Sequence, residues 1–214
     1  MSRRLPTSPP LRWCLLPLLA LLPLLALLAL AGCGPVTSPT ASSPGVQPIS
    51  TADPLSEAGG IAPGARGTVW FDARACGCLE QVTPSGLTRQ VQLGLDSAPR
   101  AIAAAPGGAL WVATAGALQR LAPNGTIRRY PLEIPEPAGP NQIVVAADGT
   151  VWFASGDGVG RLLPGGRVDR FTKGFVAQCS PRQLAIDPAG GVWFAGGTAG
   201  VGHLGASGQA SYGS

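Results

Sequence analysis

The sequence has few charged side chains, and those it has are nearly balanced. Charged residues make up 12% of the 214 residues, against about 25% in typical globular proteins. Lys173 is the only lysine and His203 is the only histidine. Three of the 15 basic residues lie before Cys33, so the remaining chain has 12 basic and 11 acidic residues and a formal charge of +1. With no basic stripe, the chain is not expected to bind nucleic acid.

Residues 1–32 are interpreted as a lipoprotein signal peptide. Three arginines precede an apolar run from Cys14 to Leu30, and Leu30-Ala31-Gly32-Cys33 follows. A charged start, a short apolar region and small residues are typical of a secretory signal. The ending resembles a bacterial lipobox, which implies lipidation of Cys33 and a protein anchored to a membrane outside the cytoplasm, at the cell surface or in the periplasm. An uncleaved membrane anchor is the alternative, although the run is short and contains two prolines.

Residues 33–56, with the lipidated cysteine first, read as a tether. Five prolines stand there among serine, threonine and alanine. Such a composition cannot bury a core and favours an extended chain. Residues 57–214 remain for one folded domain.

The domain is a repeat, marked by four tryptophans that are each 41 residues apart. They stand in similar short apolar segments that follow glycine, at Trp70, Trp111, Trp152 and Trp193. Prolines at 99, 140 and 181 keep the same step, and so do Ile61, Ile102, Ile143 and Leu184. A period of this length with two glycine turns per unit is typical of a β-propeller blade. The sequence therefore predicts an all-β fold of four four-stranded blades with almost no helix.

The tryptophans are interpreted as structural core residues. Val151-Trp152-Phe153-Ala154 has no polar alternation, so both faces of that strand should be buried, as in a blade between two neighbours. The alternative is a stacking platform for a ligand.

The candidate binding face is the end of each blade at which the Trp strand ends and the inner strand begins. Loops on a rigid scaffold often carry function. The polar residues expected there could bind a small molecule, a glycan or a protein, or could simply be solvated. They are Asp72, Arg100, Asn141, Gln142, Asp157, Arg182 and Gln183.

Three cysteines besides Cys33 remain after the signal. Cys76, Cys78 and Cys179 are all expected on the candidate face, and outside the cytoplasm a disulfide is the default for paired cysteines. A bridge from Cys76 or Cys78 to Cys179 requires the first and fourth units to meet. Four units can close into a small ring, pair with a second copy or remain an open partial propeller, and this bridge would favour the ring. The Cys-Gly-Cys spacing does not match a metal site, and none is predicted.

The repeat Pro-x-x-Ile, Gly-x-Val-Trp-Phe and Gly-Arg-Leu-x-Pro-x-Gly resembles that of the streptogramin (virginiamycin B) lyase family, related to NHL-like and gluconolactonase-like propellers. Its best match is the segment from Gly160 to Gly166. The resemblance implies a propeller, usually of seven blades, and a carbon–oxygen lyase that opens a cyclic depsipeptide with a histidine, a glutamate and a divalent cation such as Mg²⁺. The family's acid two residues after Phe is replaced here by Ala73, Thr114, Ser155 and Gly196.

Two functions follow, together with a third reading of the chain as a truncated product. The first is a non-enzymatic, lipid-anchored binding or scaffold module without a cofactor. The alternative is a metal-dependent lyase or lactonase-like enzyme, or an inactive relative of one. General acid–base catalysis needs a positioned histidine or carboxylate. His203 falls where the repeat has Arg120 and Arg161, which favours a surface position, so no catalytic residue is assigned.

Overall fold

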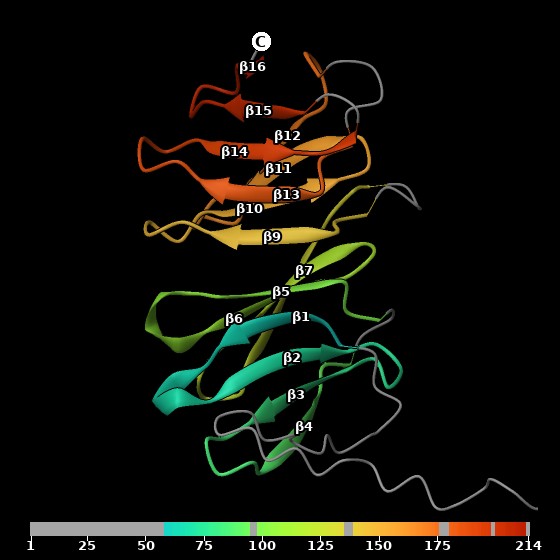
Figure 1. Cartoon of the computed structure of the whole chain (residues 1–214), viewed down its shortest axis with the longest axis vertical. Helices are drawn as coiled ribbons and strands as arrows, with labels where there is room; N and C mark the ends of the chain where they lie inside the picture. Colours follow the sequence, from blue (N-terminus) through green and yellow to red (C-terminus); the bar gives the residue numbers. More distant parts are fainter. Residues whose placement is uncertain (1–57, 95–97, 135–138, 176–179, 198–199, 213–214) are drawn as a thin grey trace, which may run out of the picture. The chain divides into compact units, whose positions relative to one another are not determined.

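The computed structural model describes residues 58–94, 98–134, 139–175, 180–197 and 200–212. In this part of the chain, four separate antiparallel sheets of four strands each follow one another in chain order, one for each 41-residue unit (Figure 1). The helical elements with described bounds are two short 3₁₀ turns, η1 (Ala65–Gly67) and η2 (Pro106–Gly108). The predicted all-β fold of four blades is confirmed. The predicted signal peptide, the tether and Cys33 lie outside the described residues.

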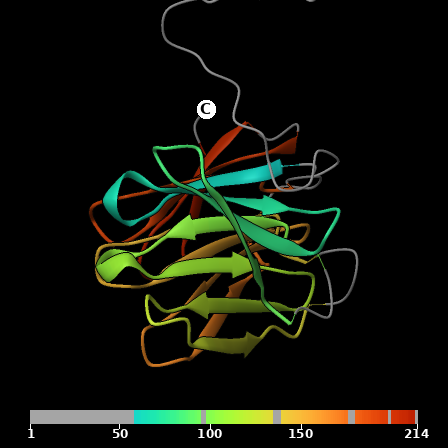
Figure 2. The same ribbon diagram turned by 90° about the horizontal axis from the view of Figure 1, so that it is seen from below.

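Within each blade, consecutive strands are hydrogen-bonded neighbours that alternate in direction (Figure 2). The first blade comprises β1 (Ala58–Pro63), β2 (Val69–Ala73), β3 (Cys78–Val82) and β4 (Thr88–Gln92). The second comprises β5 (Ala101–Ala104), β6 (Leu110–Ala113), β7 (Ala117–Leu121) and β8 (Ile127–Pro131). The third comprises β9 (Gln142–Val145), β10 (Val151–Ser155), β11 (Gly158–Leu162) and β12 (Val168–Phe171). The fourth comprises β13 (Gln183–Ile186), β14 (Val192–Ala195), β15 (Val201–Leu204) and β16 (Ala210–Tyr212).

Glycine closes the tight turn between the inner strand and the Trp strand of a blade. Gly149 has φ of 87°, in the left-handed region that favours glycine. Its backbone N–H donates to the carbonyl of Ala146 at 2.9 Å, and Asp148 accepts from the N–H of Thr150 at 2.9 Å. The turn therefore sends β10 back along β9 in register.

The core lies between blades rather than inside one. Trp111 shares a cluster with Val151 and Phe153 of the third blade. Trp152 shares a cluster with Leu184 and Phe194 of the fourth blade. The Trp strands of the second and third blades thus present their tryptophan to the following blade and their valine or phenylalanine to the preceding one, which explains the continuous apolar segment.

The four described sheets form an open array. The innermost strands contact one another in the order β1, β5, β9, β13, and the four described sheets do not close into a ring, so the fold is a partial propeller (Figure 1). Trp111 and Trp152 are buried, and Trp70 is half-buried. Trp193 is 48% exposed, which corrects the expectation that all four tryptophans are buried, because no described blade follows the fourth.

Candidate functional site

The inner strand of each later blade starts beside the end of the Trp strand, as the repeat predicts. Cross-strand partners are Ala101 with Ala113, Gln142 with Ala154, and Gln183 with Ala195. The residues just before these inner strands, and the first residues within them, therefore lie at one end of the blades, which we call the loop end.

A cavity of about 260 Å³ lies at the loop end and is bordered by the inner strands of all four blades. Four of the predicted binding residues line it: Asn141, Gln142, Arg182 and Gln183. Its remaining lining is glycine and aliphatic side chains, including Gly59 and Gly60 of β1. Guanidinium and amide groups thus face a small space with otherwise apolar walls.

Two of these four side chains also join the third blade to the fourth. The Gln142 side-chain amide donates to Gln183 Oε1 at 3.1 Å, while its Oε1 accepts from the backbone N–H of Leu184 at 2.5 Å. The Asn141 amide donates to the carbonyl of Pro181 at 3.4 Å. Gln142 therefore has a structural role and engages the side-chain oxygen of Gln183, whereas exposed Arg182 has more freedom to meet a ligand.

Arg100 lies at a neighbouring hollow rather than in the main cavity. It lines this hollow with Arg74, Pro99 and Asn141. Arg74 Nη2 donates to the carbonyl of Arg100 at 3.3 Å. Asn141 lines both spaces, so the structure brings Arg100 next to the predicted group without placing it inside the cavity.

Asp72 is fully buried, which corrects its expected place on a loop. Its Oδ1 accepts hydrogen bonds from the backbone N–H groups of Gly59 and Gly60, the latter at 2.6 Å, where β1 bulges. Its Oδ2 has no hydrogen-bond partner, and Arg74 Nε is 3.9 Å away. Burial raises the pKa of Asp72 against the opposing effect of the Gly60 and Gly59 N–H groups and Arg74. Asp72 therefore supports two glycines of the cavity wall from behind.

Asp157 does not line the loop-end cavity, because its carboxylate is bound elsewhere. It follows β10, forms an ion pair with Arg170 of the outer strand β12, and accepts a hydrogen bond from Ser155 Oγ at 2.9 Å. Desolvation opposes ionisation, but the bonds from Arg170 and Ser155 outweigh it and lower the pKa of Asp157. This carboxylate stabilises the outer edge of the third blade.

His203 is directed to the other end of its blade. Its Nε2 lies 2.7 Å from Asp187 Oδ2, and Asp187 follows the end of β13 that is opposite Gln183. Its ring centroid is 4.5 Å from that of Trp193. The backbone N–H of Ala189 and then His203 lower the pKa of Asp187. The predicted surface position fits this arrangement.

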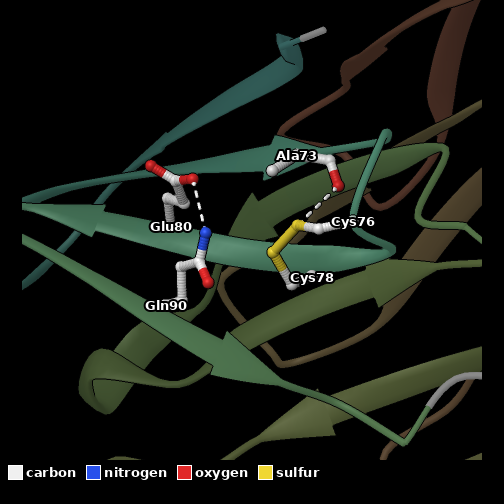
Figure 3. Close-up of a disulfide and its surroundings, with 5 residues drawn as sticks. All are labelled: Ala73, Cys76, Cys78, Glu80 and Gln90. Atoms are coloured by element: carbon white, nitrogen blue, oxygen red, sulfur yellow. Dashed lines mark hydrogen bonds between the residues drawn. A yellow bond between two sulfur atoms is a disulfide. The ribbon is translucent and has the colours of Figure 1, made fainter. Parts of the chain in front are cut away.

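The cysteine pairing differs from the predicted bridge between the first and fourth units. Cys76 and Cys78 form a disulfide with each other, with Cα atoms 5.2 Å apart, in the turn between β2 and β3 (Figure 3). Neither sulfur is then available to Cys179, which lies outside the described residues. A sequence separation of two residues allows this local pairing, which the sequence analysis did not predict.

The sequence analysis missed Arg74 and Glu80. Glu80 is fully buried and accepts a hydrogen bond from Gln90 Nε2 at 3.2 Å (Figure 3). It pairs with Phe71 across β2 and β3, where later blades have Gln119, Gly160 and Gly202. The available signal was this departure from the repeat, because an acid at a buried position of a strand must be held by hydrogen-bond partners.

The described residues contain no cluster of three or more His, Cys, Asp or Glu side chains that could hold a metal ion. The donor set that the lyase resemblance implies is therefore not matched there. No helix in the described ranges is long and apolar enough to cross a membrane.

The fold and the loop-end cavity define a partial β-propeller with a polar-lined inner face. The chain belongs to the Virginiamycin B lyase family, whose family model matches residues 44–212. No curated protein sequence matches it.

Solved structures support the same fold. A streptogramin B lyase has a TM-score of 0.71 at 20% identity, over 77% of this chain and 57% of that one. A virginiamycin B lyase from Staphylococcus aureus has a TM-score of 0.67 at 23% identity, over 75% and 56%. A gluconolactonase-type protein has a TM-score of 0.60 at 21% identity, over 76% and 64%. The chain thus spans a little over half the length of the two lyases.

Proposed function

We propose that this chain is a lipid-anchored binding module outside the cytoplasm and that its ligand binds at the loop end of the inner strands. The observation that supports this proposal is the convergence of Asn141, Gln142, Arg182 and Gln183 on one cavity bordered by all four blades. A rigid set of inner strands holds these groups, which reduces the entropy lost on binding.

The cavity favours a ligand that presents carbonyl or carboxylate oxygens. Guanidinium groups donate only, and amides both donate and accept. At about 260 Å³ the space is smaller than the roughly 300–1,000 Å³ of typical small-molecule sites. Only part of a larger ligand would enter it, with Arg182 and Gln183 contacting oxygens at the rim.

The positions of the ionisable groups favour binding over catalysis. His203 faces Asp187 at the opposite end of the fourth blade, and Asp157 is held by Arg170. Asp72 lies behind the cavity wall with Oδ1 occupied by two backbone N–H groups. None of these side chains lines the cavity, so no general base is placed beside a ligand there.

Quinupristin is a suitable probe, because a catalytically inactive variant of the S. aureus lyase was crystallised with it. Full-length protein in detergent would be titrated calorimetrically. We expect saturable binding that is at least about tenfold weaker in Arg182→Ala, the loss of about 1.4 kcal/mol. Arg66→Ala is the matched control, since Arg66 is exposed in η1 at the other end of the first blade.

Mass spectrometry of the same samples separates binding from catalysis. The proposal expects intact quinupristin after prolonged incubation. A ring-opened product that depends on added Mg²⁺ would establish the lyase alternative. Absence of binding, or equal weakening in both arginine variants, would contradict a site at the loop-end cavity.

A further inference from the structure

The two end blades expose large apolar side chains on opposite faces of the array. On the fourth blade, Trp193 is 48% exposed and Val201 is 53% exposed. On the first blade, Ile61 is 75% exposed. Contiguous exposed apolar side chains on a folded protein often mark an interaction surface.

The exposed group on the fourth blade corresponds to a buried group on the third. The cross-strand registers of the two blades match, so Trp193 occupies the place of Trp152, and Val201 that of Val159. Trp152 is 2% exposed and Val159 is 1% exposed, because both share a cluster with the fourth blade. Trp193 and Val201 therefore form a face built to be covered by a following blade.

The inner strand of the first blade carries the matching open position, whereas the side chains further out on the same side, such as Cys78 and Val82, are buried. Ile61 pairs with Phe71 as Leu184 pairs with Phe194 in the fourth blade. Leu184 and Phe194 are the residues that share a cluster with Trp152. Ile61 and Phe71 line an apolar hollow of about 380 Å³ together with Ala58, Gly59 and Gly60. We call this hollow the Ile61 groove.

We propose that a second copy of this chain docks head to tail, with Trp193 of one copy seated in the Ile61 groove of the other. Both halves of the contact are already present on one chain, and the same contact type joins its third and fourth blades. A contact between two different patches is heterologous, so two copies can make it once or twice. Roughly 150–250 Å² of each tryptophan can be buried in this way.

The test is sedimentation velocity of the full chain in detergent, without added ligand, over a range of concentrations. We expect association of the wild type, with a mass at least twice that of one chain. Trp193→Glu removes the inserted side chain and Ile61→Glu places a charge in the groove, so each variant alone should sediment as a monomer. Leu87→Glu is the control, because Leu87 is 70% exposed but lies outside both faces, and it should associate like the wild type.

Mixing the two variants gives the decisive result. Trp193→Glu chains keep an intact groove, and Ile61→Glu chains keep Trp193, so an equal mixture should form pairs through one unaltered contact. Far-UV circular dichroism confirms that each variant is folded, which is expected from the exposure of Ile61. A monomeric wild type overturns the proposal. So does a mixture that stays monomeric while the wild type associates, because that pattern indicates contact between like faces.

Discussion

Asp72 shows how a single departure from the repeat changes a blade. The equivalent positions in the other blades are Ala113, Ala154 and Ala195, each paired with one residue of its inner strand, whereas Asp72 lies opposite the β1 bulge. In the first blade the β1 bulge leaves the N–H groups of Gly59 and Gly60 without strand partners, and Asp72 Oδ1 accepts both. A buried N–H without a partner is costly, so the acid stabilises the irregular strand that borders the cavity.

Asp72 should make stability fall as pH rises. Its folded-state pKa is raised above the ordinary value of 3.8, so its stabilising contribution is complete below the unfolded pKa and is lost as pH rises through the folded pKa. Asp72→Asn retains an acceptor for the two N–H groups but does not titrate. Urea unfolding between about pH 3 and pH 7 should show wild-type stability decreasing relative to Asp72→Asn.

Asp72→Ala serves as the control for the hydrogen bonds themselves. It removes Oδ1, the acceptor for both N–H groups, and we expect a loss of about 1–3 kcal/mol for the buried donors left unsatisfied. A wild-type advantage over Asp72→Asn that grows with pH would contradict a raised pKa.

The Trp strands show that the position of a blade in the array determines how much an equivalent strand contributes to stability. β6, β10 and β14 have similar sequences and the same place in their blades. Trp111 and Trp152 are covered by the following blade, whereas Trp193 contacts His203 and solvent. Burial, not the local sequence, determines how much each tryptophan stabilises the fold.

Alanine substitutions test this difference between equivalent strands. Trp111→Ala and Trp152→Ala should each lower the free energy of unfolding by about 3–5 kcal/mol, as large buried aromatic deletions do. Trp193→Ala should lower the free energy of unfolding by less than about 1 kcal/mol at protein concentrations low enough to keep the chain monomeric. Substitutions at partly exposed surface positions change the free energy of unfolding only slightly. Denaturant unfolding curves of the three variants give the comparison. Equal losses at all three positions would contradict a core located between consecutive blades.

At the scale of the whole molecule, the proposed lipid anchor would determine on which side of the membrane the proposed binding face meets its ligand. A tether of some twenty residues rich in proline would hold the described blades away from the membrane surface. The proposed ligand would then be encountered outside the cytoplasm, where the Cys76–Cys78 disulfide is also favoured.

Cys33→Ala should release the protein from the membrane. Without the thiol no lipid can be attached, and acyl chains supply about 0.8 kcal/mol of membrane affinity for each buried CH₂ group. Fractionation of expressing bacteria, with mass spectrometry of the N-terminal peptide, measures the change. If the variant remains in the membrane fraction with residues 1–32 attached, the apolar run is an uncleaved anchor instead.

Much of the architecture follows from local signals in the sequence. The 41-residue spacing of Trp70, Trp111, Trp152 and Trp193 predicts four blades, because each unit repeats the same turn glycines and the same apolar strand. The placement of Gln142 and Gln183 at a common end also follows, since alternating strands bring the start of one beside the end of the next. Such features depend on residues that are close along the chain.

The tertiary structure alone determined which equivalent positions are covered and which polar groups meet. Trp152 and Trp193 stand in the same Val-Trp-Phe-Ala segment, yet among the described blades only Trp152 has one packed on it. Asp72 was expected on a loop, but the β1 bulge brings two backbone N–H groups to it. Cys76 or Cys78 was expected to bridge to Cys179, but the turn pairs these two cysteines with each other. Which residues are buried, and which polar groups bond to each other, depends on contacts between segments that are distant in the sequence. A repeat of identical local patterns cannot encode that difference, because its ends differ from its middle only in having fewer neighbours.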